Sequence, residues 1–144
     1  GIDLVEEIDP DLPEIFASEV RLCQLITNLI SNSVRYTPGG ARILVKATQE
    51  GENVRVCVED EGCGIKPEIL PHIFDDFFRG DRESQEGTGL GLSICRRIVA
   101  MHHGEIWAES PPPGKNKGTR VTFTIPKGAI CDLKFWERQK EDQS

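Results

Sequence analysis

Three groups of residues have types and spacings suited to binding a nucleotide. The first is a glycine-rich run, in which Gly87, Gly89 and Gly91 come directly before an apolar-periodic segment. Glycine lets the backbone approach a ligand closely, and the start of a helix offers unpaired N–H groups and the positive end of its dipole. The run therefore suits a polyphosphate, although three glycines before a helix also serve tight packing.

The second group is a polar stripe on the first helix-forming segment. Residues three and four apart share a helix face, so Gln24, Asn28, Asn32 and Arg35 align, with Tyr36 at their edge. We expect this stripe on the side opposite an apolar arc formed by Leu22, Leu25, Ile26, Leu29 and Ile30. A carboxamide oxygen is a ligand that Mg²⁺ accepts together with phosphate oxygens, and arginine holds phosphate in a fork. From this helix alone, a solvated polar face is an equally good interpretation.

The third group follows an apolar strand. Asp60, at its carboxyl end, could accept a hydrogen bond from an exocyclic amine such as that of adenine. Gly62 and Gly64 would let a flat ring lie against bare backbone. An Asp-x-Gly sequence is also common in ordinary turns, so an ordinary turn would be the favoured interpretation if this motif stood alone.

Hydrophobic periodicity and turn residues predict the elements that position these groups. Strands are expected at 2–8, 41–49, 54–59, 105–109 and 119–125. Helices are expected at 19–36, 67–73 and 92–101, with Ser18 as the N-cap of the first. Strands often follow one another directly, which favours an α+β, two-layer α/β sandwich. Its mixed, mostly antiparallel sheet would carry the helices on one face, whereas a doubly wound fold would alternate strands and helices.

Bulk properties limit the class of protein. A chain of 144 residues can form one compact domain, here assigned to 1–126, with 127–144 as a C-terminal extension. The formal net charge of −7 disfavours nucleic acid as a partner, and no apolar run is long enough to span a membrane. We therefore expect no direct membrane contact of this domain, while the full-length protein is left free to carry an anchor elsewhere. The five cysteines are odd in number and lack a C-x-x-C pair, which argues for a reducing, cytoplasmic setting without disulfides or zinc.

Together, these segments resemble the catalytic ATP-binding domain of sensor histidine kinases, in the GHKL ATP-binding superfamily. The resemblance covers roughly 3–126. Four motifs carry it, in the order and spacing of that family: the N box at 28–37, the G1 box at 60–65, the F box at 73–79 and the G2 box at 87–92. Two departures, Ser33 for the usual Ala and Ser18 for the frequent Asp, are both conservative.

The resemblance implies ATP and Mg²⁺ as cofactors, and a role for each motif residue. Asn32 would coordinate Mg²⁺ with Asn28 beside it, and Asp60 would receive the adenine amine. Arg35 and Arg79 would contact phosphate, so that Asn28, Asn32 and Arg79 form the catalytic set. The implied ATP-binding set is Asn28, Asn32, Arg35, Tyr36, Asp60, Gly62, Gly64, Ile65, Arg79, Gly87, Thr88, Gly89, Leu90, Gly91 and Leu92. Residues 80–86, which are wholly polar, would form a lid over the nucleotide.

The same resemblance favours a kinase over an ATPase. Superfamily ATPases carry a water-activating glutamate where this chain has Asn28, and a neutral carboxamide is too weak a base for that task. None of His72, His102 and His103 matches the family's phosphoacceptor, and we interpret the last two as helix C-terminal residues favoured by the dipole. The implied partners are the helical dimerisation and histidine-phosphotransfer domain of the same kinase and, through the full-length protein, a response regulator.

Two other functions stay open at this point. A serine kinase or slow ATPase of the same superfamily would use the same nucleotide site, and a non-enzymatic module could keep the fold without catalysis. Trp107 is expected to pack into the sheet core. The extension carries Ile130, Leu133, Phe135 and Trp136 at loosely helical spacing, which fits a short docked helix or a disordered tail equally well.

Overall fold

The computed structural model describes residues 3–15, 17–39, 41–75 and 91–128. Its elements, in chain order, are β1 (Asp3–Ile8), α1 (Glu19–Tyr36), β2 (Arg42–Glu50), β3 (Asn53–Asp60), the 3₁₀ helix η1 (Leu70–His72), α2 (Gly91–Met101), β4 (Glu105–Glu109) and β5 (Thr119–Pro126). Among these residues, each end of every element lies within one residue of its expected position, except in the 67–73 segment.

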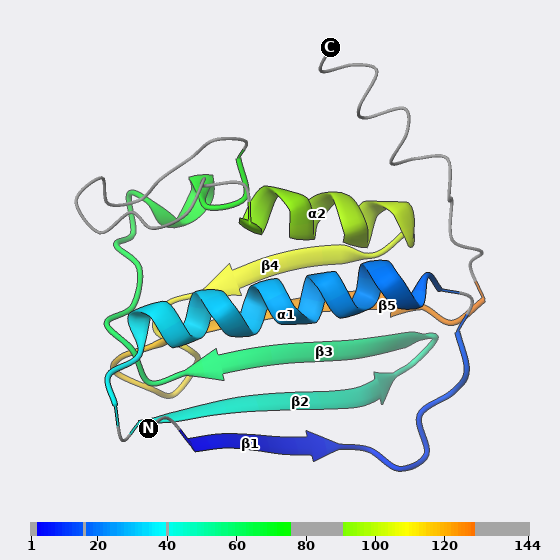
Figure 1. Ribbon diagram of the computed structural model, residues 1–144, viewed down its shortest axis with the longest axis horizontal. Coiled ribbons are helices and arrows are strands. Elements are labelled where there is room, and N and C mark those ends of the chain that lie inside the picture. The colour runs from blue at the N-terminus through cyan, green and yellow to red at the C-terminus, as the bar shows by residue number, and fades with distance from the viewer. Residues whose placement is uncertain (1–2, 16, 40, 76–90, 129–144) are drawn as a thin grey trace.

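The strands form one five-stranded sheet in the order β1-β2-β3-β5-β4. Strand β1 pairs with β2 in parallel, and the other three pairs are antiparallel. Helices α1 and α2 run side by side across one face of this sheet (Figure 1). The expected α+β sandwich with a mixed, mostly antiparallel sheet and helices on one face is confirmed.

Alternation along the central strands builds the core. Side chains such as Val45, Val58 and Phe123 point from β2, β3 and β5 toward the helices and are almost fully buried. Leu25 and Leu29 of α1 meet them from above. Burying an aliphatic side chain of this size stabilises a fold by about 1.5–3 kcal/mol, so this contact fixes α1 on the sheet.

Helix α1 begins and ends at the residues that the sequence indicates. The Ser18 hydroxyl accepts a hydrogen bond from the Arg21 amide at 3.3 Å, which caps the first turn. At the other end, the Thr37 hydroxyl donates to the Ser33 carbonyl at 2.6 Å. These caps fix which helical turn reaches the carboxyl end of β3.

The helix expected at 67–73 is wrong in extent. Only Leu70–His72 is helical, as a single 3₁₀ turn. Pro71 has no N–H, so the α-helical bond from residue 71 back to residue 67 cannot form. The segment is therefore a chain of turns that leads away from the end of β3.

Trp107 also lies elsewhere than expected. It alternates with Ile106 and Ala108, which pack against the core, so it faces the side of the sheet that carries neither α1 nor α2. There the Arg55 guanidinium lies 5.4 Å from the centre of its ring, a cation–π contact. The indole is half-buried because this face lacks a helical cover from the described residues.

His102 corrects a third expectation. It follows the last residue of α2 as expected, but it is only 1% exposed. Its Nδ1 lies 2.7 Å from the Ile98 carbonyl, and the Ser18 amide donates to its Nε2 at 3.1 Å. Accepting from that amide requires a neutral imidazole with the proton on Nδ1, so His102 joins the two helices instead of serving as a dipole cation.

Candidate nucleotide site

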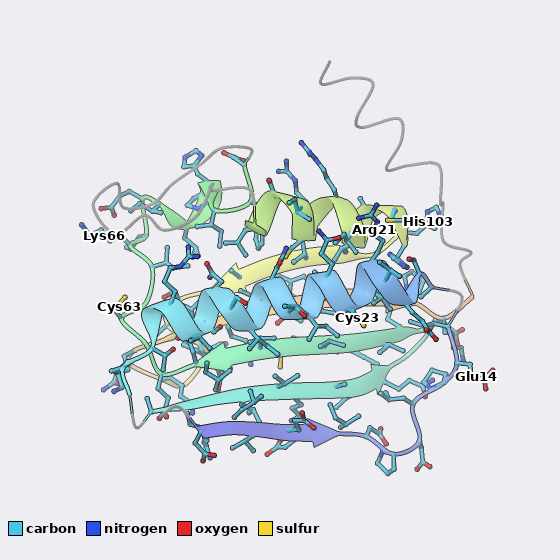
Figure 2. All side chains as sticks on the ribbon, in the orientation of Figure 1. Glu14, Arg21, Cys23, Cys63, Lys66 and His103 are labelled. Atoms are coloured by element: carbon cyan, nitrogen blue, oxygen red, sulfur yellow. The ribbon has the colours of Figure 1, made fainter. Side chains whose placement is uncertain are left out.

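Three element ends meet at one edge of the molecule. Strand β3 ends there at Asp60, α1 ends there, and α2 begins there at Gly91 (Figure 1). Figure 2 places Cys63, in the loop after β3, at this same end. The described residues of the three groups that the sequence singles out are therefore contributed by neighbouring segments.

Asp60 is the buried acid of this site. It is only 7% exposed, and its Oδ1 accepts the Gly62 amide at 2.9 Å. Burial raises the pKa of Asp60 above its ordinary value of 3.8, while hydrogen bonds from the Gly62 amide, the Ser33 hydroxyl and the Thr119 backbone oppose that rise. A carboxylate with three protein donors keeps acceptor capacity for one more donor, such as a purine amine.

The loop after Asp60 is held close to the start of β5. Gly64 adopts a φ of 78°, and the next amide, Ile65, donates to the Ser110 hydroxyl at 2.8 Å. Gly118 adopts a φ of 95°, and a Cβ at that position would collide with the Asp60 carbonyl oxygen. Both glycines are needed for this approach, because other residues seldom adopt such angles.

The polar stripe of α1 lies on a different side than expected. Asn28 and Asn32 are half-buried, and the Asn28 side chain forms a hydrogen bond to the Cys95 thiol of α2. Burial raises the pKa of Cys95 to about 12, so this group is a neutral thiol. The face of α1 opposite the sheet is instead formed by Val20, Cys23, Thr27, Ser31 and Val34. The two asparagines thus line the edge of α1 that is next to α2.

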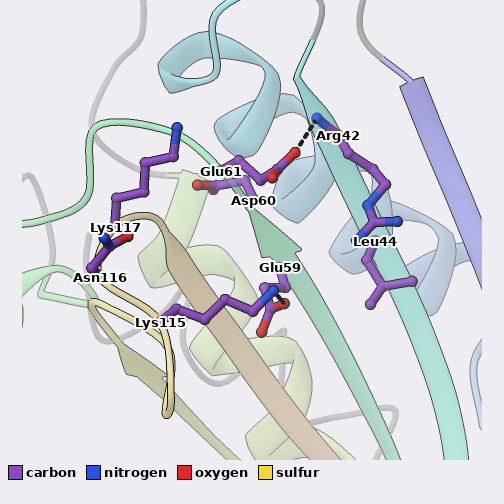
Figure 3. Close-up of a pocket in the computed structure, with 8 residues that line it drawn as sticks. All are labelled: Arg42, Leu44, Glu59, Asp60, Glu61, Lys115, Asn116 and Lys117. Carbon is purple, nitrogen blue, oxygen red and sulfur yellow. Dashed lines mark hydrogen bonds and ion pairs between the residues drawn. The ribbon is translucent and has the colours of Figure 1, made fainter.

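Two hollows lie at this end of the sheet. The larger, of about 580 Å³, is open and is lined by Arg35, Thr37, Pro38, Glu61, Gly62, Cys63 and Lys117. The smaller, of about 130 Å³, lies on the face of the sheet away from the helices (Figure 3). Lys115 pairs there with Glu59 at 3.7 Å, and Glu61 accepts the Arg42 amide at 2.8 Å. Only the larger hollow adjoins both α1 and the glycine loop.

The structure brings most of the described candidate residues to this end. Asn32 and Arg35 come from the last two turns of α1, with Asn28 one turn earlier. Tyr36 closes α1, and Gly91 and Leu92 open α2. Asp60, Gly62, Gly64 and Ile65 form the loop after β3. Arg79, Gly87, Thr88, Gly89, Leu90 and the proposed lid at 80–86 lie outside the described residues.

Four residues of this end were not predicted from the sequence to take part in the site. Ser33 and Thr119 bond the Asp60 carboxylate, Ser110 holds the loop, and Lys117 lines both hollows. The departure of Ser33 from the usual alanine of the N box was a usable signal. Ser110, Lys117 and Thr119 are far from the glycine loop in sequence, and only the strand pairing shows that they adjoin it.

The side chains at this end determine which kind of metal ion could be held there. Among the described residues, no three His, Cys, Asp or Glu side chains cluster as a metal site. A cation held here would therefore depend on carboxamides such as Asn32 together with phosphate oxygens, which is a ligand set that Mg²⁺ accepts.

Among the described residues, neither helix combines the length and hydropathy that crossing a bilayer requires.

Known proteins share this arrangement. Residues 17–129 match the family of histidine kinase-, DNA gyrase B-, and HSP90-like ATPases. The adaptive-response sensory kinase SasA of Rippkaea orientalis is 39% identical over 128 residues, which make up 88% of this chain and 32% of that protein. The chain thus spans about a third of the length of the curated relatives it matches, 31–33% in each.

Matches to solved structures identify the type of protein within this family. The catalytic domain of the histidine kinase ThkA matches with a TM-score of 0.76 at 35% identity, over 88% of this chain and 80% of that one. ThkA in complex with the response regulator protein TrrA matches with a TM-score of 0.70 at 32% identity, over 88% and 34%. Full-length ShkA in complex with AMPPNP matches with a TM-score of 0.76 at 30% identity, over 91% and 27%. The chain therefore belongs to the histidine kinase-, DNA gyrase B- and HSP90-like ATPase family, as an ATP-binding catalytic domain of the histidine kinase type.

Proposed function

We propose that this domain holds Mg-ATP at the Asp60 end of the sheet and, within a longer sensor histidine kinase, passes the γ-phosphoryl group to a histidine. The observation that carries the proposal is the buried Asp60 carboxylate beside a glycine loop and the asparagine edge of α1. The complex of ShkA, a structural relative, with the ATP analogue AMPPNP supports the choice of nucleotide.

Recognition of adenine falls to Asp60. Its ionised side chain can accept only, so a ligand must present a donor, as the 6-amino group of adenine does and the 6-oxo group of guanine does not. Gly62 and Gly64, which have no side chains, leave room for the plane of the base. At this position, the protein would thereby favour the 6-amino group of adenine over the 6-oxo group of guanine.

Phosphate and metal binding fall to α1 and to the start of α2. Asn32 would hold Mg²⁺ through its carboxamide oxygen, with Asn28 beside it, and the ion when bound would neutralise charge on the phosphates. Arg35 is exposed at the end of the same helix and can pair with phosphate oxygens. Outside the described residues, Arg79 and Gly87 to Leu90 complete the proposed set, as a cation and as backbone donors at the amino end of α2.

Phosphoryl transfer should be preferred to hydrolysis. Asn28 occupies the place of the water-activating glutamate, and its side chain is engaged with the Cys95 thiol of α2. A carboxamide cannot take a proton from water at neutral pH, so bound ATP waits for a better nucleophile. Positioning and charge stabilisation are what phosphoryl transfer chiefly asks of a protein.

The partners of the full-length protein follow the same proposal. The nucleophile would be a histidine on a helical dimerisation domain, and the phosphoryl group would then pass to a response regulator. The complex of ThkA with TrrA supports the second step. We also propose a cytoplasmic setting, which the free thiols Cys23, Cys57, Cys63 and Cys95 support.

Isothermal calorimetry with Mg-ATP tests the proposal. Asn32→Ala and Asp60→Ala should each strongly weaken the micromolar-to-millimolar binding of Mg-ATP, because each removes a polar side chain that the proposal places against the ligand. Asn53→Ala and Asp11→Ala are matched controls, since both residues lie away from the Asp60 end, and they should bind as the wild type does. Unchanged affinity in both Asn32→Ala and Asp60→Ala would contradict the proposal.

A further inference from the structure

Ser110 lies between β4 and β5, and its hydroxyl makes three hydrogen bonds. It accepts from the Ile65 amide at 2.8 Å and from the Thr119 hydroxyl at 3.2 Å, and it donates to the Gly118 carbonyl at 2.7 Å. A hydroxyl has one hydrogen and two lone pairs, so every position is used. The Ser110 side chain therefore has a single orientation in which all three bonds are made.

These bonds tie together the two segments that flank Asp60. On one side, Ile65 ends the loop whose Gly62 amide binds the Asp60 carboxylate. On the other, Thr119 is the strand partner of Asp60 in the pairing of β3 with β5, and its backbone also bonds that carboxylate. A shift of either segment would move a donor away from Asp60.

The backbone is built for this close approach. A Cβ on Gly64 would lie 3.0 Å from the Ser110 hydroxyl oxygen, which is tighter than ordinary contact. On the other side, the Gly118 carbonyl accepts the hydrogen bond from the Ser110 hydroxyl, and the Gly118 backbone lies directly against the Asp60 carbonyl. Both glycines have positive φ, a conformation that other residues seldom adopt, and the close contacts with Ser110 depend on it.

We propose that Ser110 is a positioning residue for purine recognition, fixing the Asp60 carboxylate against the 6-amino group through its bonds to Ile65 and Thr119. Ser110 itself need not touch the nucleotide. The inference rests on the proposed function, because it assumes that Asp60 receives the amine of ATP. It extends that function by adding a residue more than forty positions away from the glycine loop that binds the base.

Selectivity for the amine tests this role. The readout is the ratio of the Kd of purine riboside triphosphate, which lacks the 6-amino group, to the Kd of ATP. Ser110→Ala should lower this ratio roughly tenfold, the scale of one hydrogen bond of ordinary strength. Thr119→Val, which breaks one of the three bonds and keeps its side-chain shape, should lower the ratio by roughly threefold. A purely structural role would weaken both ligands equally and leave the ratio unchanged.

Two further variants make the result decisive. Thr122→Val removes another buried hydroxyl of β5, one that lacks a hydrogen-bond partner, and it should preserve the ratio. Asp60→Ala should reduce the ratio to about one. If Asp60→Ala binds ATP as the wild type does, the role that the proposed function gives to Asp60 fails, and the role of Ser110 fails with it. If Asp60→Ala loses selectivity while Ser110→Ala and Thr119→Val keep it, only the role of Ser110 is overturned. Thr119→Val decides alone if Ser110→Ala does not fold.

Discussion

At the scale of single residues, Asp60 must satisfy two opposed demands. Burial raises its pKa from 3.8, so the folded apo domain holds the proton more tightly than the unfolded chain does. The stability that protonation contributes is fully present below pH 3.8 and is lost as the pH rises through the raised folded-state pKa. Purine binding needs the opposite form, because only the ionised carboxylate is purely an acceptor.

Stability and affinity should therefore respond to pH with opposite signs. We predict that, as the pH falls from 7 toward 3.8, the unfolding free energy of the wild type rises relative to that of Asp60→Asn, while its affinity for ATP falls. Denaturant titrations of both apo proteins measure the first quantity and calorimetry the second. Because other carboxylates titrate in both proteins alike, the difference isolates Asp60. A difference that does not change with pH would show that the pKa of Asp60 is not shifted.

At the scale of elements, His102 joins the two helices at the end far from Asp60. Its Nε2 accepts the Ser18 amide, which begins α1, and its Nδ1 bonds Ile98 in α2. We predict that His102→Phe lowers the unfolding free energy by about 2 kcal/mol, because the Ser18 amide is left without its buried partner. Thermal unfolding followed by circular dichroism measures the loss, with a fall of roughly 6 °C for a domain of this size.

His103 supplies the matched control. It is exposed, with a φ of 63°, a conformation that asparagine tolerates well. His103→Asn should therefore change stability by no more than about 0.5 kcal/mol, as exposed substitutions usually do. His102→Phe should still bind ATP once folded, because the hydrogen bonds of His102 to Ser18 and Ile98 lie away from the nucleotide end. Equal losses of unfolding free energy in the two variants would mean that the end of α2, and not the hydrogen bonds of His102, determines the effect.

Elements were easier to predict than the contacts between them. Caps are local signals, so Ser18 was sufficient to define where α1 begins. The side on which Asn28 lies depends on α2, which follows some sixty residues later, and no periodicity within α1 reveals that neighbour. Asp60 could be recognised from its glycines, whereas Ser110 could not, because it reaches the site only through the pairing of β4 with β5. Local signals thus give the elements and the nucleotide motifs, and pairing supplies what surrounds them.

At the scale of the whole molecule, the proposed function gives the domain a site for ATP, and the resemblance implies that none of its three histidines is the phosphoacceptor. His72 is an exposed residue of η1 paired with Asp75, His102 is buried between the helices, and His103 follows it. His102 and His103 follow the end of α2 that is far from Asp60, where Figure 2 labels His103. Under the proposed function, the γ-phosphoryl group would therefore go to a histidine on another protein surface.

We predict that this domain, given labelled Mg-ATP alone, releases phosphate slowly and labels itself very little. Mixed with the helical histidine-bearing domain of its own kinase, it should label that domain in an Asn32-dependent manner. Phosphohistidine is hydrolysed in acid and survives alkali, whereas phosphoserine does the reverse, so treating the labelled product both ways identifies the acceptor. Acid-stable label would favour a serine kinase of the same superfamily. Rapid phosphate release without the partner would instead favour an ATPase. It would mean that water is activated even though Asn28 stands where the ATPases carry their glutamate base.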